Sequence, residues 1–149
     1  MCGAHATVRG FLGELVSSTS ARLDVVVDME AGLEHLSRGT GKHLSGFVAV
    51  VEPYYRSMET ARRIAELAAG LGVPEVVAVT NKIRDETDRD LVNGFCAAHG
   101  LQVVADIPYD PALLAAERAG RPPLDFDADS PAVLAIGRLG ATLRQRYGE

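Results

Sequence analysis

The sequence predicts an α/β domain in which helices flank a parallel sheet. Short apolar runs rich in valine alternate along the chain with segments whose apolar residues recur at helical spacing. Continuous apolar runs of this kind are typical of parallel strands that are buried on both faces. Strands and helices that alternate in this order form a parallel sheet with right-handed crossovers. Because the chain has 149 residues, 47% of them apolar, we expect residues 1–149 to form a single domain.

Four apolar runs are the predicted strands, and each ends at polar or turn-forming residues. They are Leu23–Asp28, Phe47–Val51, Glu75–Thr80 and Leu101–Ile107. Their lengths are ordinary for strands of globular proteins. We therefore expect a four-stranded parallel sheet.

Helices are predicted between and after these strands. The expected helices are Thr7–Ser18, Met58–Leu71, a helix from Asp85 or Thr87 to Ala98, Pro111–Ala119, and a last helix from Ser130–Pro131 to about Arg146. Ser57 is expected to cap the second helix and Gly72 to end it. Ser130 is a good N-cap because Pro131 then takes the first helical position. The Pro- and Asp-rich stretch Arg121–Asp129 is expected to be a loop.

Composition excludes several classes of protein. The net charge of −5 and the pI near 5.4 argue against a general nucleic-acid surface. No apolar run reaches membrane-spanning length, and the N-terminus lacks the pattern of a signal peptide. The two cysteines, Cys2 and Cys96, form no C-x-x-C motif and fit a reducing compartment. We therefore expect a cytoplasmic protein that binds neither nucleic acid nor membrane.

A carboxylate and a glycine follow the first predicted strand, in the sequence DMEAG. Asp28 ends the apolar run, and Gly32 lies four residues later. Open α/β sheets bind ligands at the carboxyl ends of their strands, and glycine lets backbone approach a ligand closely. The spacing suits a site that senses a phosphate or a phosphate-bound metal. The alternative is an aspartate that caps a helix or closes a turn, and the spacing leaves both interpretations open.

Two further predicted strands also end in polar clusters. These clusters are Thr80–Lys82 and Pro108–Asp110. Because the strands of a parallel sheet all point the same way, their carboxyl ends lie at one edge of the sheet. We therefore expect both clusters to meet the Asp28–Gly32 segment in one crevice.

Four stretches carry a family resemblance. They resemble the deviant-Walker P-loop ATPases, the group of the nitrogenase iron protein and the bacterial division-site ATPases. Within that group they are most similar to the ATPases that assist nickel insertion into carbon monoxide dehydrogenase. The stretches are VVVDMEAGLEHLSRGT, VVEPYYRSMETARRIAELA, VTNKIRDE and IPYDPALLAAERAGRPPLD. The resemblance implies a P-loop NTPase fold and an ATP-dependent metallochaperone, a homodimer that closes over nucleotide and serves a client metalloenzyme.

The resemblance also implies roles for individual residues, with ATP or ADP and magnesium as cofactors. Asp28 resembles the family's second acidic motif, which acts on magnesium or on the attacking water. Gly32 would be the backbone donor that senses the γ-phosphate.

The adenine-reading position of the family matches Asn81, with Lys82 beside it. Pro108, Tyr109 and Asp110 would line the base pocket. Asn81-Lys82 is also similar to the guanine-reading N-K-x-D motif, but Asp85 falls one residue late. Asn81 is therefore interpreted as an adenine contact or as a simple residue at the start of a helix.

One departure from the family is large. The family begins with a strand and a phosphate loop, K-G-G-x-G-K-[ST], and this sequence contains no such loop. Its one Gly-Lys pair, Gly41–Lys42, is followed by His43 and has Leu36 where the first glycine belongs. We therefore expect the C-terminal part of the family domain, as a split subunit, a truncated gene model or a degenerate paralogue. Phosphate binding depends on that loop, so we expect weak ATP binding or none, and no hydrolysis, by this chain alone.

The N-terminus shows a second departure. The subgroup binds metal jointly through a C-x-C pair at the dimer interface, and Cys2 matches only the second of these cysteines. Two Cys2 residues of a symmetric dimer would supply two thiolates for nickel or zinc, short of a closed zinc site. The alternative is a frayed N-terminal cysteine without a metal.

Three functions follow from these observations. The first is a nucleotide-binding metallochaperone ATPase, or part of one, that delivers nickel. The second is a non-catalytic dimerisation or interaction module derived from such an ATPase. The third is a Rossmann-like enzyme, which ranks last because no G-x-G-x-x-G follows any predicted strand.

Overall fold

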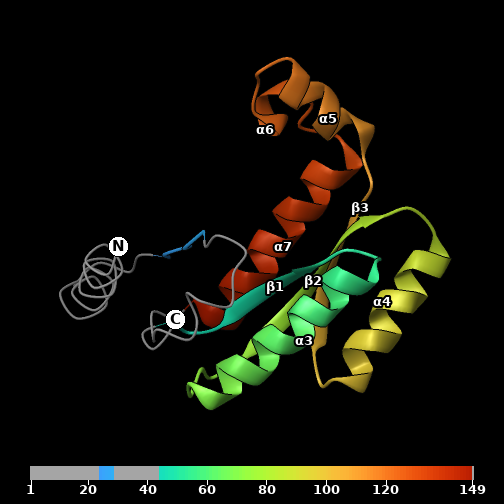
Figure 1. Ribbon diagram of the computed structural model, residues 1–149. Coiled ribbons are helices and arrows are strands. Elements are labelled where there is room, and N and C mark those ends of the chain that lie inside the picture. The colour runs from blue at the N-terminus through green and yellow to red at the C-terminus, as the bar shows by residue number, and fades with distance from the viewer. Residues whose placement is uncertain (1–23, 29–43, 149) are drawn as a thin grey trace, which may run out of the picture.

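A parallel sheet of three strands forms the centre of the molecule. The computed structural model describes residues 24–28 and 44–148. The strands are β1 (Phe47–Val51), β2 (Val76–Ile83) and β3 (Gln102–Pro108), and they lie in the order β1-β2-β3 (Figure 1). Both strand pairs are parallel. The predicted fold class, a parallel sheet with flanking helices, is confirmed.

Helices cover both faces of the sheet. They are α3 (Tyr55–Gly70), α4 (Glu86–Ala98), α5 (Pro111–Arg118), α6 (Pro123–Phe126) and α7 (Pro131–Tyr147). Helices α3 and α4 pack on one face, and α7 crosses the other (Figure 1). Helices α5 and α6 lie beyond the carboxyl end of β3 (Figure 1).

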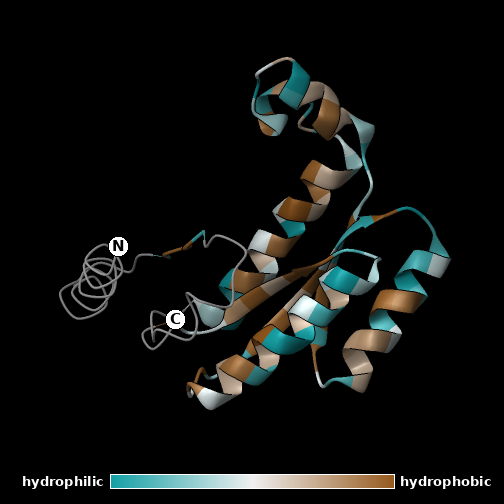
Figure 2. Ribbon diagram, viewed as in Figure 1, coloured by the Kyte–Doolittle hydropathy of each residue, from teal (hydrophilic) through white to brown (hydrophobic). Residues whose placement is uncertain are grey.

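The core has two parts because the sheet is buried on both faces. Consecutive residues of β2 serve opposite sides: Ala78 packs with Met58 of α3 and Val92 of α4, whereas Val79 packs with Ala132 of α7. Figure 2 shows the corresponding apolar strands between helices that are apolar mainly on their inner sides. Burial on both faces explains why the strands are continuous apolar runs in the sequence.

Three of the four predicted strands are confirmed, and one is wrong over its described residues. β2 continues past its predicted end at Thr80 to Ile83. Of the predicted strand Leu23–Asp28, the described residues 24–28 form neither helix nor strand. Val25 and Val26 are 49% and 91% exposed, and no described strand pairs with them. An apolar run becomes a strand only when a neighbour satisfies its backbone, and residues 24–28 have no such neighbour among the described residues. The predicted helix Thr7–Ser18 lies outside the described residues.

Most helix boundaries follow the capping residues in the sequence. Asp85 caps α4, since its carboxylate accepts the N–H of Asp88 at 2.9 Å, and Ser130 caps α7. The prediction that Ser57 caps α3 is wrong. The helix starts at Tyr55, three residues earlier than predicted, and the Ser57 hydroxyl accepts the N–H of Glu52 at 2.9 Å. Gly72 ends this helix in the left-handed region, with φ of 71°, as predicted.

The segment 121–129 is only partly a loop. It was expected to carry no regular structure, but it contains the short helix α6. Pro123 takes the first helical position, where its fixed φ favours the start of a helix. Among the described residues, no helix is both long and apolar enough to cross a bilayer.

The C-terminal end of α7 is fastened to the start of the sheet by Glu75. The Tyr147 hydroxyl and the Arg146 guanidinium both donate to the Glu75 carboxylate, each with a 2.7 Å contact. Arg146 also donates to the Gln102 side chain at 2.7 Å. The hydrogen bonds from Arg146 and then Tyr147 lower the pKa of Glu75 to about 2.

We predict that Glu75→Gln reduces stability at neutral pH but not in acid. A carboxylate whose folded pKa is depressed stabilises the fold above its unfolded pKa and loses this contribution as pH falls through the folded value. The difference in free energy of unfolding should be up to about 1 kcal/mol at pH 7, as for a partly exposed ion pair. It should shrink between pH 5 and pH 2. Urea denaturation across this range measures it, with Glu117→Gln on the exposed face of α5 as the control. If the difference in free energy of unfolding did not change with pH, the stabilisation could not come from the ionised Glu75 carboxylate.

Candidate functional site

An irregularity in the sheet places two of the predicted site residues. Thr80 pairs with Asp106 and Ile83 pairs with Pro108, so two residues of β2, Asn81 and Lys82, lie opposite a single residue of β3. An extra residue of this kind is a β-bulge, which redirects side chains at the end of a strand. The bulge therefore sets the direction in which Asn81 and Lys82 project.

A partly buried hydrogen bond joins the two strands just before the bulge. The Thr80 hydroxyl donates to Asp106 Oδ1 at 2.6 Å, and Thr80 is fully buried. The Nε of Arg89, from α4, lies 3.5 Å from the other oxygen of Asp106. A hydroxyl that donates to a carboxylate makes a short, strong hydrogen bond. Sequence reasoning missed Asp106, although a carboxylate within an apolar run was a visible signal.

Lys82 is held by the end of β1. Its Nζ lies 2.9 Å from Glu52 Oε1, and this hydrogen bond raises the pKa of Lys82. Its φ of 58° is in the left-handed region, where side chains other than glycine are strained. Lys82 was predicted to bind nucleotide, but its charge is already paired within the chain. Sequence reasoning did not assign Glu52 to the site.

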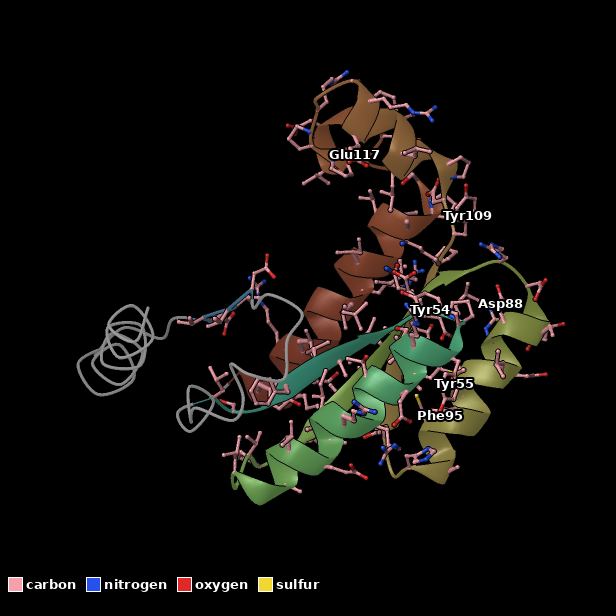
Figure 3. All side chains as sticks on the ribbon, in the orientation of Figure 1. Tyr54, Tyr55, Asp88, Phe95, Tyr109 and Glu117 are labelled. Carbon is pink, nitrogen blue, oxygen red and sulfur yellow. The ribbon has the colours of Figure 1, made fainter. Side chains whose placement is uncertain are left out.

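Among the described residues of this edge, Asn81 and Tyr109 are open to a ligand. Asn81 is half-buried, and among the described residues its side chain forms no hydrogen bond. Tyr109 lies beside it because its N–H donates to the Ile83 carbonyl at 2.8 Å. The Tyr109 ring is 50% exposed, and the Arg84 guanidinium carbon is 5.9 Å from its centre. Figure 3 shows Tyr109 where β3 leads into α5, at the carboxyl end of the sheet.

Asp110 is fully engaged in fixing two helices. Its Oδ1 accepts the N–H of Ala112 at 2.9 Å, at the start of α5. Its Oδ2 accepts the N–H of Ala132 at 3.0 Å, in the first turn of α7. The hydrogen bond from Ala132 is the main reason that the pKa of Asp110 is lowered. Asp110 therefore orients the helices behind the site, and its carboxylate oxygens are both occupied.

The remaining predicted site residues are apart from this cluster or outside the described residues. Asp28 is exposed and lies along a groove beside Val48 and Val50 of β1. No contact joins it to Asn81 or Tyr109. Gly32 and Cys2 lie outside the described residues. Two of the three predicted polar clusters therefore meet, and the convergence of the third stays a prediction.

The cluster can hold a flat heteroaromatic ring. The Asn81 amide offers one acceptor and two donors, which complement a base edge that carries both kinds of group. The exposed ring of Tyr109 can stack on such a base. Pro108, which precedes Tyr109, pairs with Ile83 and so links the ends of the two strands that carry Asn81 and Tyr109. In the described part of the chain, no group of three or more His, Cys, Asp or Glu side chains could hold a metal ion.

Comparison with curated proteins finds an accessory protein and several ATP-binding proteins. The chain is 36% identical over 120 residues to the carbon monoxide dehydrogenase accessory protein CooC of Rhodospirillum rubrum, covering 80% of this chain and 44% of that protein. It is 32% identical over 140 residues to an uncharacterised ATP-binding protein of Methanocaldococcus jannaschii, covering 93% and 52%. The chain thus spans about half the length of these relatives. No family model matches the sequence.

Comparison with solved structures supports the same fold. The MinD cell division protein of Aquifex aeolicus superposes with a TM-score of 0.68 over 97% of this chain and 61% of MinD, at 20% identity. At this identity the likeness concerns the fold alone. It agrees with the parallel sheet and flanking helices described above.

We predict that Lys82→Gly is more stable than Lys82→Ala, by about 1 kcal/mol. Both variants lose the ion pair with Glu52, so the comparison isolates the backbone, and only glycine adopts a positive φ without strain. Urea denaturation of the two variants measures the difference. The control pair is Asp90→Gly and Asp90→Ala in α4, where alanine should be the more stable residue by a similar amount. Equal stabilities at position 82 would show that the bulge relaxes in the variants.

Proposed function

This chain belongs to the deviant-Walker P-loop ATPases, and we propose that it provides the base-binding side of an ATP site. The observation that carries the proposal is the bulge of β2, which presents the amide of Asn81, unbonded among the described residues, beside the exposed ring of Tyr109. ATP binding is named for the relative from Methanocaldococcus jannaschii. The bulge and Tyr109 lie at the carboxyl ends of parallel strands, where α/β proteins bind nucleotides.

The residues at this edge fit the base of ATP better than its phosphates. Asn81 can pair with the adenine edge, and Tyr109 can stack on its face. The nearest cation of the bulge, Lys82, is neutralised by Glu52, and no glycine-rich phosphate loop occurs in these 149 residues. In the proposed ATPase, Asp28 acts on magnesium or on the attacking water, and Gly32 donates to the γ-phosphate. These two roles rest on the family resemblance of the DMEAG motif.

The client of the proposed ATPase follows from one relative. CooC is named as an accessory protein of carbon monoxide dehydrogenase, and we extend this role to the present chain. The protein would then act as a homodimer that uses ATP to deliver nickel to an apo-metalloenzyme. Cys2 is the candidate ligand of the metal at the dimer interface.

A second function is favoured by the surface of the sheet. Among the described strands, β1 pairs only with β2, and its outer edge borders an apolar groove, which suits protein contact. The alternative is therefore a non-catalytic interaction module derived from such an ATPase. Nucleotide binding separates the two functions, because only the first requires the base-binding cluster.

We predict that the chain binds adenosine and magnesium ATP with similar, weak affinities. The described residues contact the base and offer little to the phosphates, so the two dissociation constants should agree within about threefold. Asn81→Ala should weaken binding about 3- to 10-fold, the usual range for one hydrogen bond. Tyr109→Ala should weaken it by at least a similar factor through lost stacking. Calorimetric titration to millimolar ligand measures these constants.

The matched controls for this experiment lie away from the cluster. Gln145→Ala on α7 and Phe126→Ala on α6 should leave affinity unchanged, and guanosine should bind more weakly than adenosine. Binding that is unaffected by Asn81→Ala would contradict the assigned base contact. Absence of binding by any nucleoside or nucleotide would favour the interaction module.

We predict that Ni²⁺ binding depends on Cys2 and not on Cys96. Cys96 is fully buried in α4, and burial raises the pKa of its thiol, so the metal-binding thiolate is disfavoured. Equilibrium dialysis should find one Ni²⁺ for two chains in the wild type and in Cys96→Ser, and none in Cys2→Ser. Retention of stoichiometric metal by Cys2→Ser would remove Cys2 from the proposed interface site.

A further inference from the structure

The loop that follows β2 carries an arginine beside the base-binding cluster. Arg84 lies between the end of β2 at Ile83 and the start of α4 at Glu86, and it is exposed. Its guanidinium carbon is 5.9 Å from the centre of the Tyr109 ring. Figure 3 shows Tyr109 close to the segment between β2 and α4. Arg84 is therefore within reach of a ligand that stacks on Tyr109.

The bulge in β2 decides on which side of the sheet Arg84 lies. Side chains of a strand alternate between the two faces, and Ala78 packs into the core under α3 and α4. Strict alternation from Ala78 would place Ile83 on the opposite face, but Ile83 packs into the same core. The extra residue of the bulge has reset the alternation. Arg84 therefore falls on the α7 side of the sheet, where Val79 packs and where Asn81 follows by alternation.

The backbones of Arg84 and Tyr109 are held side by side. Ile83 pairs with Pro108, and the N–H of Tyr109 donates to the Ile83 carbonyl at 2.8 Å. Arg84 and Tyr109 are the next residues after this pair. The N–H of Arg84 donates to Asp88 Oδ2 at 3.1 Å, in the first turn of α4. The side chains of Arg84 and Tyr109 therefore project from fixed, neighbouring positions.

Arg84 differs from the neighbouring cations in what its charge contacts. The Nζ of Lys82 pairs with Glu52 at 2.9 Å, and the Nε of Arg89 lies 3.5 Å from Asp106. The guanidinium of Arg84 instead lies over an aromatic ring, which attracts a cation only weakly at an exposed site. A planar guanidinium also stacks on flat rings. Arg84 can thus exchange this ring for the face of a bound base at little cost.

The distance between Arg84 and Tyr109 is close to that of a slot for a flat ring. Groups in contact lie about 3.5 Å apart, so a base held on both faces requires about 7 Å between the two groups that enclose it. The present 5.9 Å is wider than direct stacking and falls short of this requirement by about 1 Å. An exposed arginine side chain changes rotamer readily, so it moves that far without a change in the backbone.

We propose that Arg84 forms the second face of the base site, so that an adenine base is held between its guanidinium and the Tyr109 ring. Asn81 then reads the edge of the base while the two flat groups bind its faces. The inference rests on the proposed function, because it adds a contact to the same site. It assigns Arg84 to the base, although arginine beside a nucleotide is a common ligand of phosphate.

Adenosine and magnesium ATP separate a base contact from a phosphate contact. In calorimetric titrations, Arg84→Ala should weaken the binding of both ligands by the same factor, about 3- to 10-fold, because the guanidinium interacts with the base that they share. Arg84→Lys, which keeps the charge without the plane, should recover part of the affinity. The matched control is Arg138→Ala on α7, which removes the same charge from an exposed position and should bind both ligands as the wild type does.

A second measurement reports the contact itself. An aromatic ring shifts the NMR signals of protons that lie over its face, so the Nε–H signal of Arg84 should move upfield when adenosine is added to the wild type. This signal is identified by its absence from the spectrum of Arg84→Ala. The Nε–H signal of Arg138 is the internal control and should not move.

Four results would overturn the inference. If Arg84→Ala binds adenosine as the wild type does while Asn81→Ala binds it more weakly, Arg84 is not part of the site and the base site itself stands. If Arg84→Ala loses affinity for magnesium ATP alone, Arg84 is a ligand of the phosphates. If adenosine binds without moving the Nε–H signal of Arg84, the base lies on the other face of Tyr109. If adenosine does not bind to the wild type, the base site and this inference fail together.

Discussion

The central strand β2 is the constraint on which the rest of the structure depends. It is paired on both edges and covered on both faces, so its side chains alternate between two cores. Val77, Ala78, Val79 and Thr80 are almost completely buried. A strand in this position has no freedom to slip, because a shift of one residue would exchange the side chains of the two cores. The positions of the helices and of the strand ends follow from this fixed register.

The candidate nucleotide site lies where a β-bulge interrupts this register. At Thr80 the partly buried hydrogen bond to Asp106 joins the two strands, and immediately after it the bulge inserts an extra residue. The strain at Lys82 is held in place by Glu52 on one side and by the pairing of Ile83 on the other. Such local strain persists only where the surrounding structure determines it. The carboxylate of Asp110, which was expected in a base pocket, instead starts two helices behind the site.

The two functional proposals concern opposite parts of one sheet. The base-binding cluster lies at the carboxyl ends of β2 and β3, whereas the groove lies along the outer edge of β1. An exposed strand edge is a ready template for another chain, and natural proteins usually cover it.

The sequence alone determined the fold class, the order of the elements and most of their ends. Continuous valine runs and the capping residues Asp85, Ser130 and Gly72 are local signals, so they can be recognised without a structure. The sequence also predicted that Asn81 and Tyr109 lie near each other, because parallel strands end at one edge. Only the tertiary structure decided which side chains remain free. Lys82 and Asp110 are engaged by Glu52 and by the start of α7, residues distant in the sequence, and residues 24–28 find no pairing partner among the described strands. Hydrogen bonds of this kind depend on contacts between distant segments, and a local pattern carries no information about them.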